Sequence, residues 1–157
     1  MSEESTSFLR EAIRMATDNV RNGGGPFGAI VVKDGRIVGR GVNRVTSNHD
    51  PTAHAEVVAI RDACSHLKSF QLDGCVIYSS CEPCPMCLGA IYWARLEKVI
   101  FAATKETASA SGFDDGFIYR EIALSPEDRQ IPFLHYEELD HTAPFAEWIS
   151  NAAKTEY

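Results

Sequence analysis

Hydrophobic residues near the N-terminus recur first at helical spacing and then at strand spacing. Apolar positions three to four residues apart predict an amphipathic helix over residues 7–21, and the glycines that follow end it. Two β-rich runs over 27–32 and 36–42 flank Asp34-Gly35, a dipeptide that favours a tight hairpin turn. The chain is therefore expected to begin with a helix and a β-hairpin. The apolar stripe of the helix is Phe8, Leu9, Ala12, Ile13, Ala16 and Val20.

Helices and strands alternate through the middle of the chain. A helix is predicted over about 50–67, with Asp50 or Thr52 as its cap. The elements predicted after it are an apolar strand over 75–79, a helix over 85–94 and a strand over 98–103. The order α-β-β-α-β-α-β predicts an α/β fold, a three-layer α/β/α sandwich with a mixed central sheet.

The patterning weakens towards the C-terminus. Small residues over 104–115 predict a loop with a helical turn at most, whereas 133–136 suggests a final strand and 142–151 a helix. No internal repeat or domain boundary is visible. A length of 157 residues suits one core, so we expect a single domain over 1–157.

The composition of the chain indicates which partners are disfavoured, among them nucleic acid and membranes. The net charge is −7, and no basic run is present, so nucleic acid is a disfavoured partner. No apolar run approaches the roughly 20 residues that a membrane helix needs. The first residues are polar and acidic, which does not resemble a signal peptide. We therefore expect a cytoplasmic protein with no membrane association.

The cysteines are concentrated in one stretch. Three of the five lie within 81–87, a pattern that indicates metal binding or catalysis in a reducing compartment. Cys84 and Cys87 are spaced to reach one metal ion. Pro85 is favoured as a first helical residue, which places both thiols at a helix N-terminus, where the dipole favours thiolate. This pair is expected to supply half of a zinc site.

His54 is the candidate for a third ligand, because it begins the preceding helix. Three protein ligands leave a fourth position for water, which is typical of a catalytic zinc. Glu56, two residues further on, can reach that water and move its proton. Two alternatives stay open: Cys81 could close the site as a fourth ligand, and Glu56 could only stabilise the helix dipole. A non-catalytic zinc module is a competing function, but it has no use for such a carboxylate.

Two motifs carry a resemblance to a known family. His54-Ala55-Glu56 followed by Pro83-Cys84-Pro85-Met86-Cys87 matches the signature of zinc deaminases. The chain resembles the cytidine-deaminase-like superfamily over nearly its whole length, and is more narrowly similar to the bacterial guanine deaminases. The stretches that carry the narrower resemblance are 24–29, 50–56, 112–115 and 154–157, among which Phe113-Asp114-Asp115 and the terminal Tyr157 indicate guanine.

The resemblance implies one zinc ion per subunit, held by His54, Cys84 and Cys87. It implies that Glu56 carries a proton from water on the metal to a ring nitrogen of guanine, with xanthine and ammonia as products. In the family, the residue at Cys81 lies just outside the coordination sphere.

The resemblance also assigns substrate contacts. Asn43 would hydrogen-bond the purine, and Asp115 would lie near the ring and the departing amino group. Phe27 and Trp93 would surround the pocket. Asn43 could instead shape a turn, and Trp93 could belong to the core or to an interface. The choice of Asp115 over Asp114 rests on the family alone.

The family further implies a homodimer. Its C-terminal segment, about 142–157 here, crosses to the partner subunit, so that Tyr157 would enter the neighbouring pocket. The expected substrate is a small purine base. Guanosine or another small amino-heterocycle such as ammeline stays open as an alternative. Adenosine or cytosine in nucleic acid is disfavoured by the acidic charge.

Overall fold

The computed structural model describes residues 3–157. The chain divides into two compact units, Met1–Asp115 and Gly116–Tyr157. We call the second the C-terminal unit. The elements of the first unit are α1 (Glu3–Arg21), β1 (Gly28–Lys33), β2 (Arg36–Val42), α2 (Val45–Asn48), α3 (Ala55–Leu67), β3 (Cys75–Cys81), α4 (Pro85–Trp93), β4 (Lys98–Ala103) and α5 (Lys105–Ala110). The C-terminal unit contains α6 (Gly116–Ala123), a 3-10 turn (Pro126–Asp128) and α7 (Ala143–Ser150).

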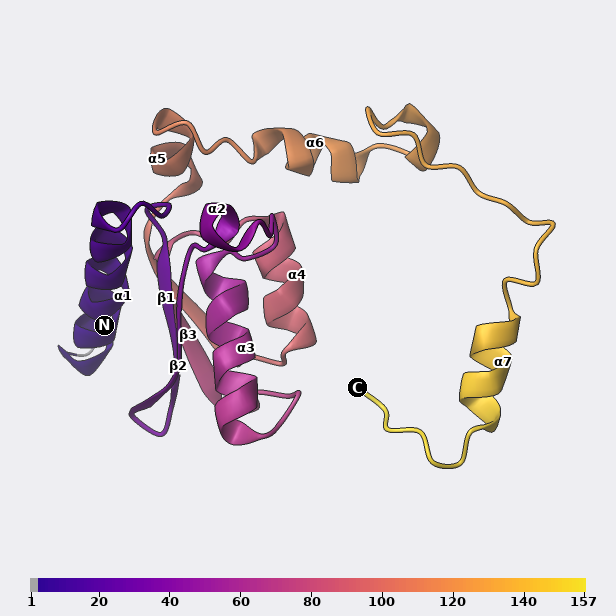
Figure 1. Cartoon of the computed structure of the whole chain (residues 1–157), viewed down its shortest axis with the longest axis horizontal. Coiled ribbons are helices and arrows are strands. Elements are labelled where there is room, and N and C mark those ends of the chain that lie inside the picture. The colour runs from indigo at the N-terminus through magenta and orange to yellow at the C-terminus, as the bar shows by residue number, and fades with distance from the viewer. Residues whose placement is uncertain (1–2) are drawn as a thin grey trace. The chain divides into compact units, whose positions relative to one another are not determined.

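The four strands of the first unit form one mixed sheet in the order β2-β1-β3-β4. β1 pairs antiparallel with β2 and β3, whereas β3 and β4 are parallel. Helix α1 covers one face of this sheet, and α3 and α4 cover the other (Figure 1). The predicted three-layer α/β/α sandwich with a mixed central sheet is therefore confirmed. No helix among residues 3–157 combines the length and the apolar character needed to cross a bilayer.

Side chains alternate along β1 to serve the two layers. Ile30 and Val32 belong to the cluster with Leu9 of α1, whereas Ala29 and Val31 pack with α3 and α4. This two-residue period is the one expected of a strand covered on both faces. The sheet is thus a fixed platform on which α3 and α4 are held side by side.

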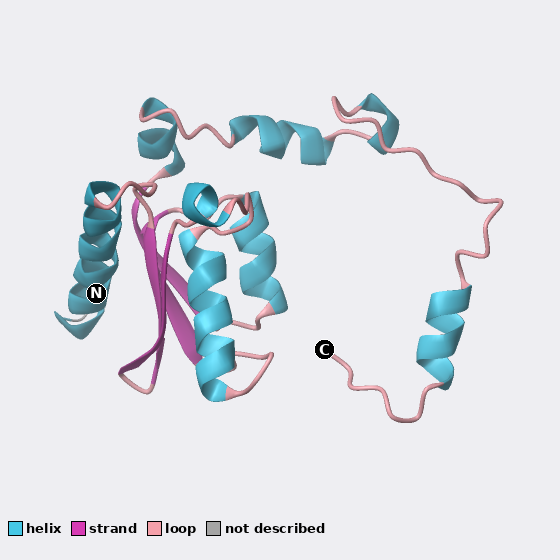
Figure 2. Cartoon of the chain, viewed as in Figure 1, coloured by secondary structure: helices cyan, strands magenta, loops and turns pink. Residues whose placement is uncertain are grey.

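The hairpin prediction is confirmed, and its chemistry is visible in the backbone. Asp34 and Gly35 have φ values of +49° and +70°, as a type I′ turn requires of both central residues. The pairing of Lys33 with Arg36 closes the turn. Figure 2 shows the two strands running from this turn into the sheet.

The predicted start of α3 is wrong by several residues. Asp50 does not cap a helix, because its Oδ1 accepts hydrogen bonds from the amide and the hydroxyl of Thr52, at 2.8 and 2.7 Å. This local turn satisfies the side chain before the helix begins. The helix starts at Ala55, and His54 is its extended N-cap residue. The later start leaves the side chain of His54 at the open end of α3.

Three further boundaries differ from the predictions. Helix α1 begins at Glu3, earlier than its apolar stripe indicates, because two acidic residues extend its first turn favourably. Residues 104–115, predicted as a loop that can include a helical turn, contain the 6-residue helix α5. The strand predicted over 133–136 is wrong, since the structure describes this segment without regular structure. The helix predicted over 142–151 is confirmed as α7.

The C-terminal unit lacks a core of its own. Among residues 116–157, all of which the structure describes, none is buried. Its local order comes from polar contacts: Arg129 donates to the carbonyl oxygens of Glu121 and Leu124. The large exposed apolar side chains are Phe117, Tyr119, Ile122, Leu124, Ile131, Phe133, Leu134, Tyr136, Leu139, Phe145, Trp148, Ile149 and Tyr157. A segment of this size rarely folds alone, so this apolar surface needs a partner.

Gly41 lets α3 approach the edge strand β2. A Cβ at this position would overlap the carbonyl oxygen of Ala55 and the amide nitrogen of Ala59. We expect Gly41→Ala to lower the free energy of unfolding by about 3 kcal/mol, because the added methyl group overpacks a rigid contact. Denaturant unfolding monitored by circular dichroism measures this change. Arg40→Ala, an exposed position on the same strand, serves as control, with an expected effect within about 0.5 kcal/mol. Equal effects of the two substitutions would contradict the packing argument.

Candidate metal centre

Two helix starts bring three metal-binding side chains together. His54 is the N-cap residue of α3, Cys84 is the N-cap residue of α4, and Cys87 lies in the first turn of α4. Their ligand atoms all lie within 4.8 Å of one another, and within residues 3–157 this is the group of His, Cys, Asp or Glu that could hold a metal ion. The prediction that His54 meets the cysteine pair is therefore matched by the geometry.

The distances within the group fit zinc. His54 Nδ1 lies 3.5 Å from Cys84 Sγ and 3.6 Å from Cys87 Sγ. A tetrahedral zinc with ordinary bond lengths separates its nitrogen and sulfur ligands by about 3.6 Å. One imidazole and two thiols are also a donor set that zinc prefers. The three side chains thus fit the ion without rearrangement.

The local backbone explains why these side chains face the centre. The side chains of His54 and Cys84 form no capping hydrogen bond, although the backbone carbonyls of both accept the first helical bonds, from Val58 and Leu88 at 2.9 Å. The side chains are therefore available to a metal. Pro85 starts α4 as expected, with no amide hydrogen to satisfy. Both helix dipoles favour negative charge at this point.

The three ligand side chains shift one another's pKa values. A hydrogen bond from Cys87, together with the bond to His54, lowers the pKa of Cys84 to about 4 against the effect of burial. The same bond to Cys84, with burial, raises the pKa of Cys87. The contact with Cys84 raises the pKa of His54. Metal binding displaces the remaining protons, since zinc takes thiolate and neutral imidazole.

Glu56 lies beside the ligands without belonging to their group. Its side chain is 5% exposed, and burial raises the pKa of its carboxyl, with the charge of Cys84 acting in the same direction. Ser79 Oγ donates to Oε1 at 3.3 Å, and Cys87 Sγ donates to Oε2 at 3.4 Å. A buried carboxyl with a raised pKa, held at a metal centre, can accept a proton and give it back.

Ser79 is a buried neighbour of Glu56 that the sequence pattern did not single out. It is 2% exposed and faces Glu56 from β3. The signal was the pair Ser79-Ser80, two polar residues in an otherwise apolar strand directly before the cysteine cluster. Such residues are buried only where their hydroxyls have partners. Ser80 has a different one, the amide of Gly28 at 3.0 Å.

We expect Ser79→Ala to reduce kcat about tenfold while zinc stays bound, because a charged carboxylate loses a buried hydrogen bond worth about 1.5–3 kcal/mol. The measurement is steady-state kinetics together with the zinc content of the purified variant. Ser80→Ala is the matched control, and should change stability more than kcat. A normal kcat for Ser79→Ala would show that this hydroxyl does not position Glu56.

Cys81 lies outside the ligand group. Its Sγ donates to the carbonyl oxygen of Thr104 at 3.7 Å, and burial raises the pKa of the thiol to about 11. It belongs to the buried core rather than to the cluster. This placement favours the open, three-ligand arrangement over a closed structural site.

Hydrogen bonds fix the backbone of Asn43 near that of His54. The amide of Arg44 donates to the carbonyl oxygen of Ala53 at 2.9 Å, and the amide of Asn43 donates to Phe27 at 3.1 Å. Asn19 Nδ2 donates to the carbonyl oxygen of Asn43 at 2.9 Å. Asn43 itself is buried, and its Oδ1 accepts a bond from Val45 at 3.3 Å. The turn-forming role and a binding role are therefore compatible.

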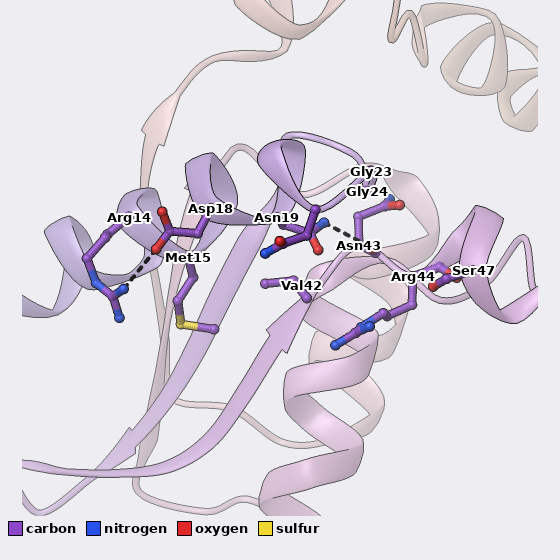
Figure 3. Close-up of a pocket in the computed structure, with 11 residues that line it drawn as sticks. Arg14, Met15, Asp18, Asn19, Gly23, Gly24, Val42, Asn43, Arg44 and Ser47 are labelled. Atoms are coloured by element: carbon purple, nitrogen blue, oxygen red, sulfur yellow. Dashed lines mark hydrogen bonds and ion pairs between the residues drawn. The ribbon is translucent and has the colours of Figure 1, made fainter.

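A cavity of about 410 Å³ adjoins Asn43 but is not the metal centre. It lies between α1, the Gly23-Gly24 turn, the end of β2 and α2, and none of the three ligands lines it (Figure 3). Arg14, at its rim, is engaged by Glu11 and Asp18. The site must therefore be defined by the side-chain cluster and not by this cavity.

Phe27 and Asp115 lie in the first unit as well. The rings of Phe27 and Phe113 meet edge to face with centroids 5.0 Å apart, which ties the loop before Asp115 to the start of β1. Burial raises the pKa of Asp115, and the charge of Cys84 adds to the effect. Asp115 is half-buried, whereas Asp114 is exposed. The structure thus favours Asp115 over Asp114 as the carboxylate near the cluster.

One predicted contact residue, Trp93, is not brought to the cluster. Trp93 ends the nine-residue α4, at the opposite end from Cys84, since each helical residue adds about 1.5 Å. Its side chain is 64% exposed. Tyr157 belongs to the C-terminal unit. For these two residues the predicted contacts stay predictions.

Known proteins show the same combination of fold and motif. Residues 2–103 match the family described as cytidine and deoxycytidylate deaminase zinc-binding region. The chain is 54% identical over 152 residues to the guanine deaminase of Bacillus subtilis (strain 168), which covers 96% of this chain and 97% of that protein. The X-ray structure of guanine deaminase from Bacillus subtilis superposes with a TM-score of 0.96 at 53% identity, over 100% of this chain and 99% of that one.

Other relatives match a smaller share of the chain. The tRNA-specific adenosine deaminase of Aquifex aeolicus (strain VF5) is 47% identical over 96 residues, 61% of this chain and 64% of that protein. A solved structure of guanine deaminase from Nitrosomonas europaea gives a TM-score of 0.68 at 32% identity, over 73% of this chain and 66% of that one. Among these relatives, the guanine deaminase of Bacillus subtilis matches over nearly the whole chain.

Proposed function

This chain belongs to the deaminase family that shares the cytidine and deoxycytidylate deaminase zinc-binding region, and from that premise we propose that it catalyses the hydrolytic deamination of guanine to xanthine and ammonia. The observation that carries the proposal is the buried Glu56 beside a three-ligand group for zinc. The identity of 54% to a guanine deaminase over nearly the whole chain supports the substrate.

His54, Cys84 and Cys87 hold the zinc ion, one per subunit. When bound, the ion lowers the pKa of water and so supplies a nucleophile near neutral pH. Three protein ligands in place of four leave room for that water. The residues of the chain then have to bind the base, exclude bulk solvent and move protons.

Glu56 performs the proton transfers. It takes a proton from the attacking water and delivers it to a ring nitrogen of guanine. A C–O bond forms at C2. Glu56 then passes the remaining hydroxyl proton to the amino nitrogen, the bond from C2 to that nitrogen breaks, and ammonia leaves. Ser79 holds one carboxylate oxygen throughout, so that the other oxygen faces the reacting atoms.

Asn43, Phe27 and Asp115 bind the base. Asn43 offers an amide that is already buried, so its hydrogen bond to a purine edge forms in a low dielectric. Phe27 provides an aromatic surface fixed by Phe113, against which a flat ring can stack. Asp115 accepts a hydrogen bond from the departing amino group. The raised pKa of its carboxyl favours a proton-sharing role there.

Adenosine in tRNA is the second candidate, because the Aquifex relative is a tRNA-specific adenosine deaminase and is 47% identical over 96 residues. The charge of −7 argues against it, since phosphate contacts need Lys and Arg. Guanosine differs from guanine only by an uncharged ribose, and is therefore the closer competitor.

A panel of substrates tests the proposal. Purified holoenzyme is incubated with guanine, guanosine, adenine, adenosine, cytosine, cytidine and a tRNA, and ammonia release is followed. We expect guanine to give a kcat/KM at least about 100-fold above any other compound, since unpaired polar groups in a shaped site discriminate strongly. Preferred turnover of tRNA adenosine or of guanosine would overturn the assignment to guanine.

We also propose a homodimer in which the segment about 142–157 is exchanged between subunits. The C-terminal unit has no buried residue, and the first unit exposes apolar side chains of its own, among them Tyr92 and Trp93 on α4 and Phe101 on the edge strand β4. Two such surfaces of one chain cover each other most simply in a symmetric pair. Trp93 then lies where the two copies meet. This position is compatible with a role in the interface and with a role at the pocket.

Removal of Tyr157 is expected to reduce kcat/KM for guanine about 100-fold without changing the unfolding temperature, because the residue caps the neighbouring pocket and supports no core. Steady-state kinetics and thermal unfolding measure the two effects. The decisive experiment is co-expression with an inactive Glu56→Gln chain that retains Tyr157. Random pairing makes about half of the dimers mixed, and each mixed dimer has one complete site out of two. About a quarter of the normal number of complete sites should therefore be restored. If each tail served its own subunit, the mixture would show no recovery.

A further inference from the structure

The last residues of the chain fold back towards α7 instead of extending. The amide of Lys154 donates to the carbonyl oxygen of Asn151 at 3.2 Å, and the amide of Ala153 donates to Asn151 Oδ1 at 2.9 Å. The amide of Asn151 in turn closes α7 by donating to Glu147 at 3.0 Å. The turn after the helix is therefore defined by hydrogen bonds on both of its sides.

This turn brings the terminal ring against Trp148. The rings of Trp148 and Tyr157 lie edge to face, with centroids 6.3 Å apart and planes at 77°. Lys154 Nζ lies 5.9 Å from the centroid of the same indole. It also donates to the carbonyl oxygen of Ile149 at 3.4 Å and pairs with Glu156 at 3.8 Å. Lysine, indole and phenol thus form one small cluster on the end of α7.

Exposure within the cluster is unequal. The side chain of Lys154 is 24% exposed, whereas Tyr157 remains 71% exposed. Most terminal residues fray because nothing holds them. Here Lys154 and Trp148 hold the tail in place. The ring of Tyr157 contacts Trp148 and is otherwise largely exposed.

We propose that Trp148 and Lys154 are positioning residues that preset Tyr157 for the pocket it caps. The inference rests on the proposed capping role of Tyr157. Ordering a rotamer-rich tail at the moment of binding costs affinity, and an arrangement formed in advance avoids that cost. Trp148 and Lys154 act only through Tyr157 and do not touch the base.

The test compares Trp148→Leu with Trp148→Phe in the full-length holoenzyme. Trp148→Leu should raise KM for guanine about two- to tenfold, the range of an aromatic pair, with kcat nearly unchanged. Trp148→Phe, which keeps an aromatic face for both partners, should restore most of the loss. Lys154→Met should resemble Trp148→Leu, and Lys154→Arg should resemble the unchanged protein.

A double-variant cycle separates positioning from general support of α7. In the protein that lacks Tyr157, Trp148→Leu should have no further effect on KM, because the residue through which it acts is gone. Additive effects would overturn the inference, and so would a normal KM for Trp148→Leu or for the protein without Tyr157.

A fluorescence measurement without substrate tests this inference independently of the proposed reaction. The chain contains two tryptophans, so Trp93→Phe leaves Trp148 as the sole indole. Removing Tyr157 from this variant should change the fluorescence intensity or emission maximum of Trp148. An unchanged spectrum would overturn the contact even if guanine is turned over. A changed spectrum in a protein that does not deaminate guanine would support the preset tail and reject the proposed function alone.

Discussion

Replacing Glu56 by glutamine will reduce the turnover of guanine by about 10³-fold and leave zinc bound. The size of the loss follows from general acid–base catalysis, which contributes about 10²–10⁴-fold when one group makes the transfers. Glutamine keeps the shape of the side chain and an oxygen for the hydroxyl of Ser79. It cannot take a proton from water, so only the transfer step is removed.

Ammonia release gives the rate of this variant, and elemental analysis gives its zinc content. Glu82→Gln is the matched control: this carboxylate lies within the cysteine stretch, but it accepts a bond from the amide of Lys105 at 3.1 Å and not from the cluster. It should retain activity within a few-fold. Near-normal turnover by Glu56→Gln would refute the proton-transfer role, whereas loss of zinc would show that Glu56 supports the ligands instead.

Replacing His54 by alanine will remove zinc and lower the unfolding temperature by about 10 °C. A ligand bound at 1,000 times its Kd stabilises the folded state by about 4 kcal/mol, and each kcal/mol shifts Tm by about 2–4 °C in a protein of this size. Without the imidazole, the thiols of Cys84 and Cys87 offer only two donors. The starts of α3 and α4 then lose the ion that joins them.

Thermal unfolding with and without a chelator identifies the cause. Chelation should lower the Tm of the unchanged protein but not that of His54→Ala, which has no ion to lose. Cys81→Ser is the control, because Cys81 lies outside the ligand group, and it should retain zinc and the response to the chelator. Stoichiometric zinc in His54→Ala, or its loss from Cys81→Ser, would show that the ligand set is different.

Local chemistry made some features readable from the sequence. Asp34-Gly35 predicts its own turn, because both residues tolerate positive φ. Pro85 and the spacing of Cys84 and Cys87 place two ligands on a helix start without any tertiary information. The role of His54 followed from its neighbours and not from its own type, since a lone histidine indicates little.

Other features could not be predicted from the sequence. Some depend on which of two local structures forms, and others on contacts between residues distant in sequence. At Asp50 a turn and a helix cap use the same carboxylate, and the turn prevails. Ser79 meets Glu56 only because β3 lies beside the start of α3. The apolar run at 133–136 predicted a strand, but a strand needs a neighbour for its backbone groups, and none lies beside it within the C-terminal unit.

The two helix starts that share one ion have a consequence for how this protein tolerates change. His54 and Cys84 are both N-cap residues whose side chains form no capping hydrogen bond. Losing any one ligand therefore loosens both helices at once, and the first substitution carries nearly the whole cost. A second ligand substitution would then be almost silent, because the interaction it removes has already gone. The three ligands are therefore expected to change together in evolution. One substitution is enough to lose zinc binding, whereas regaining it requires all three residues.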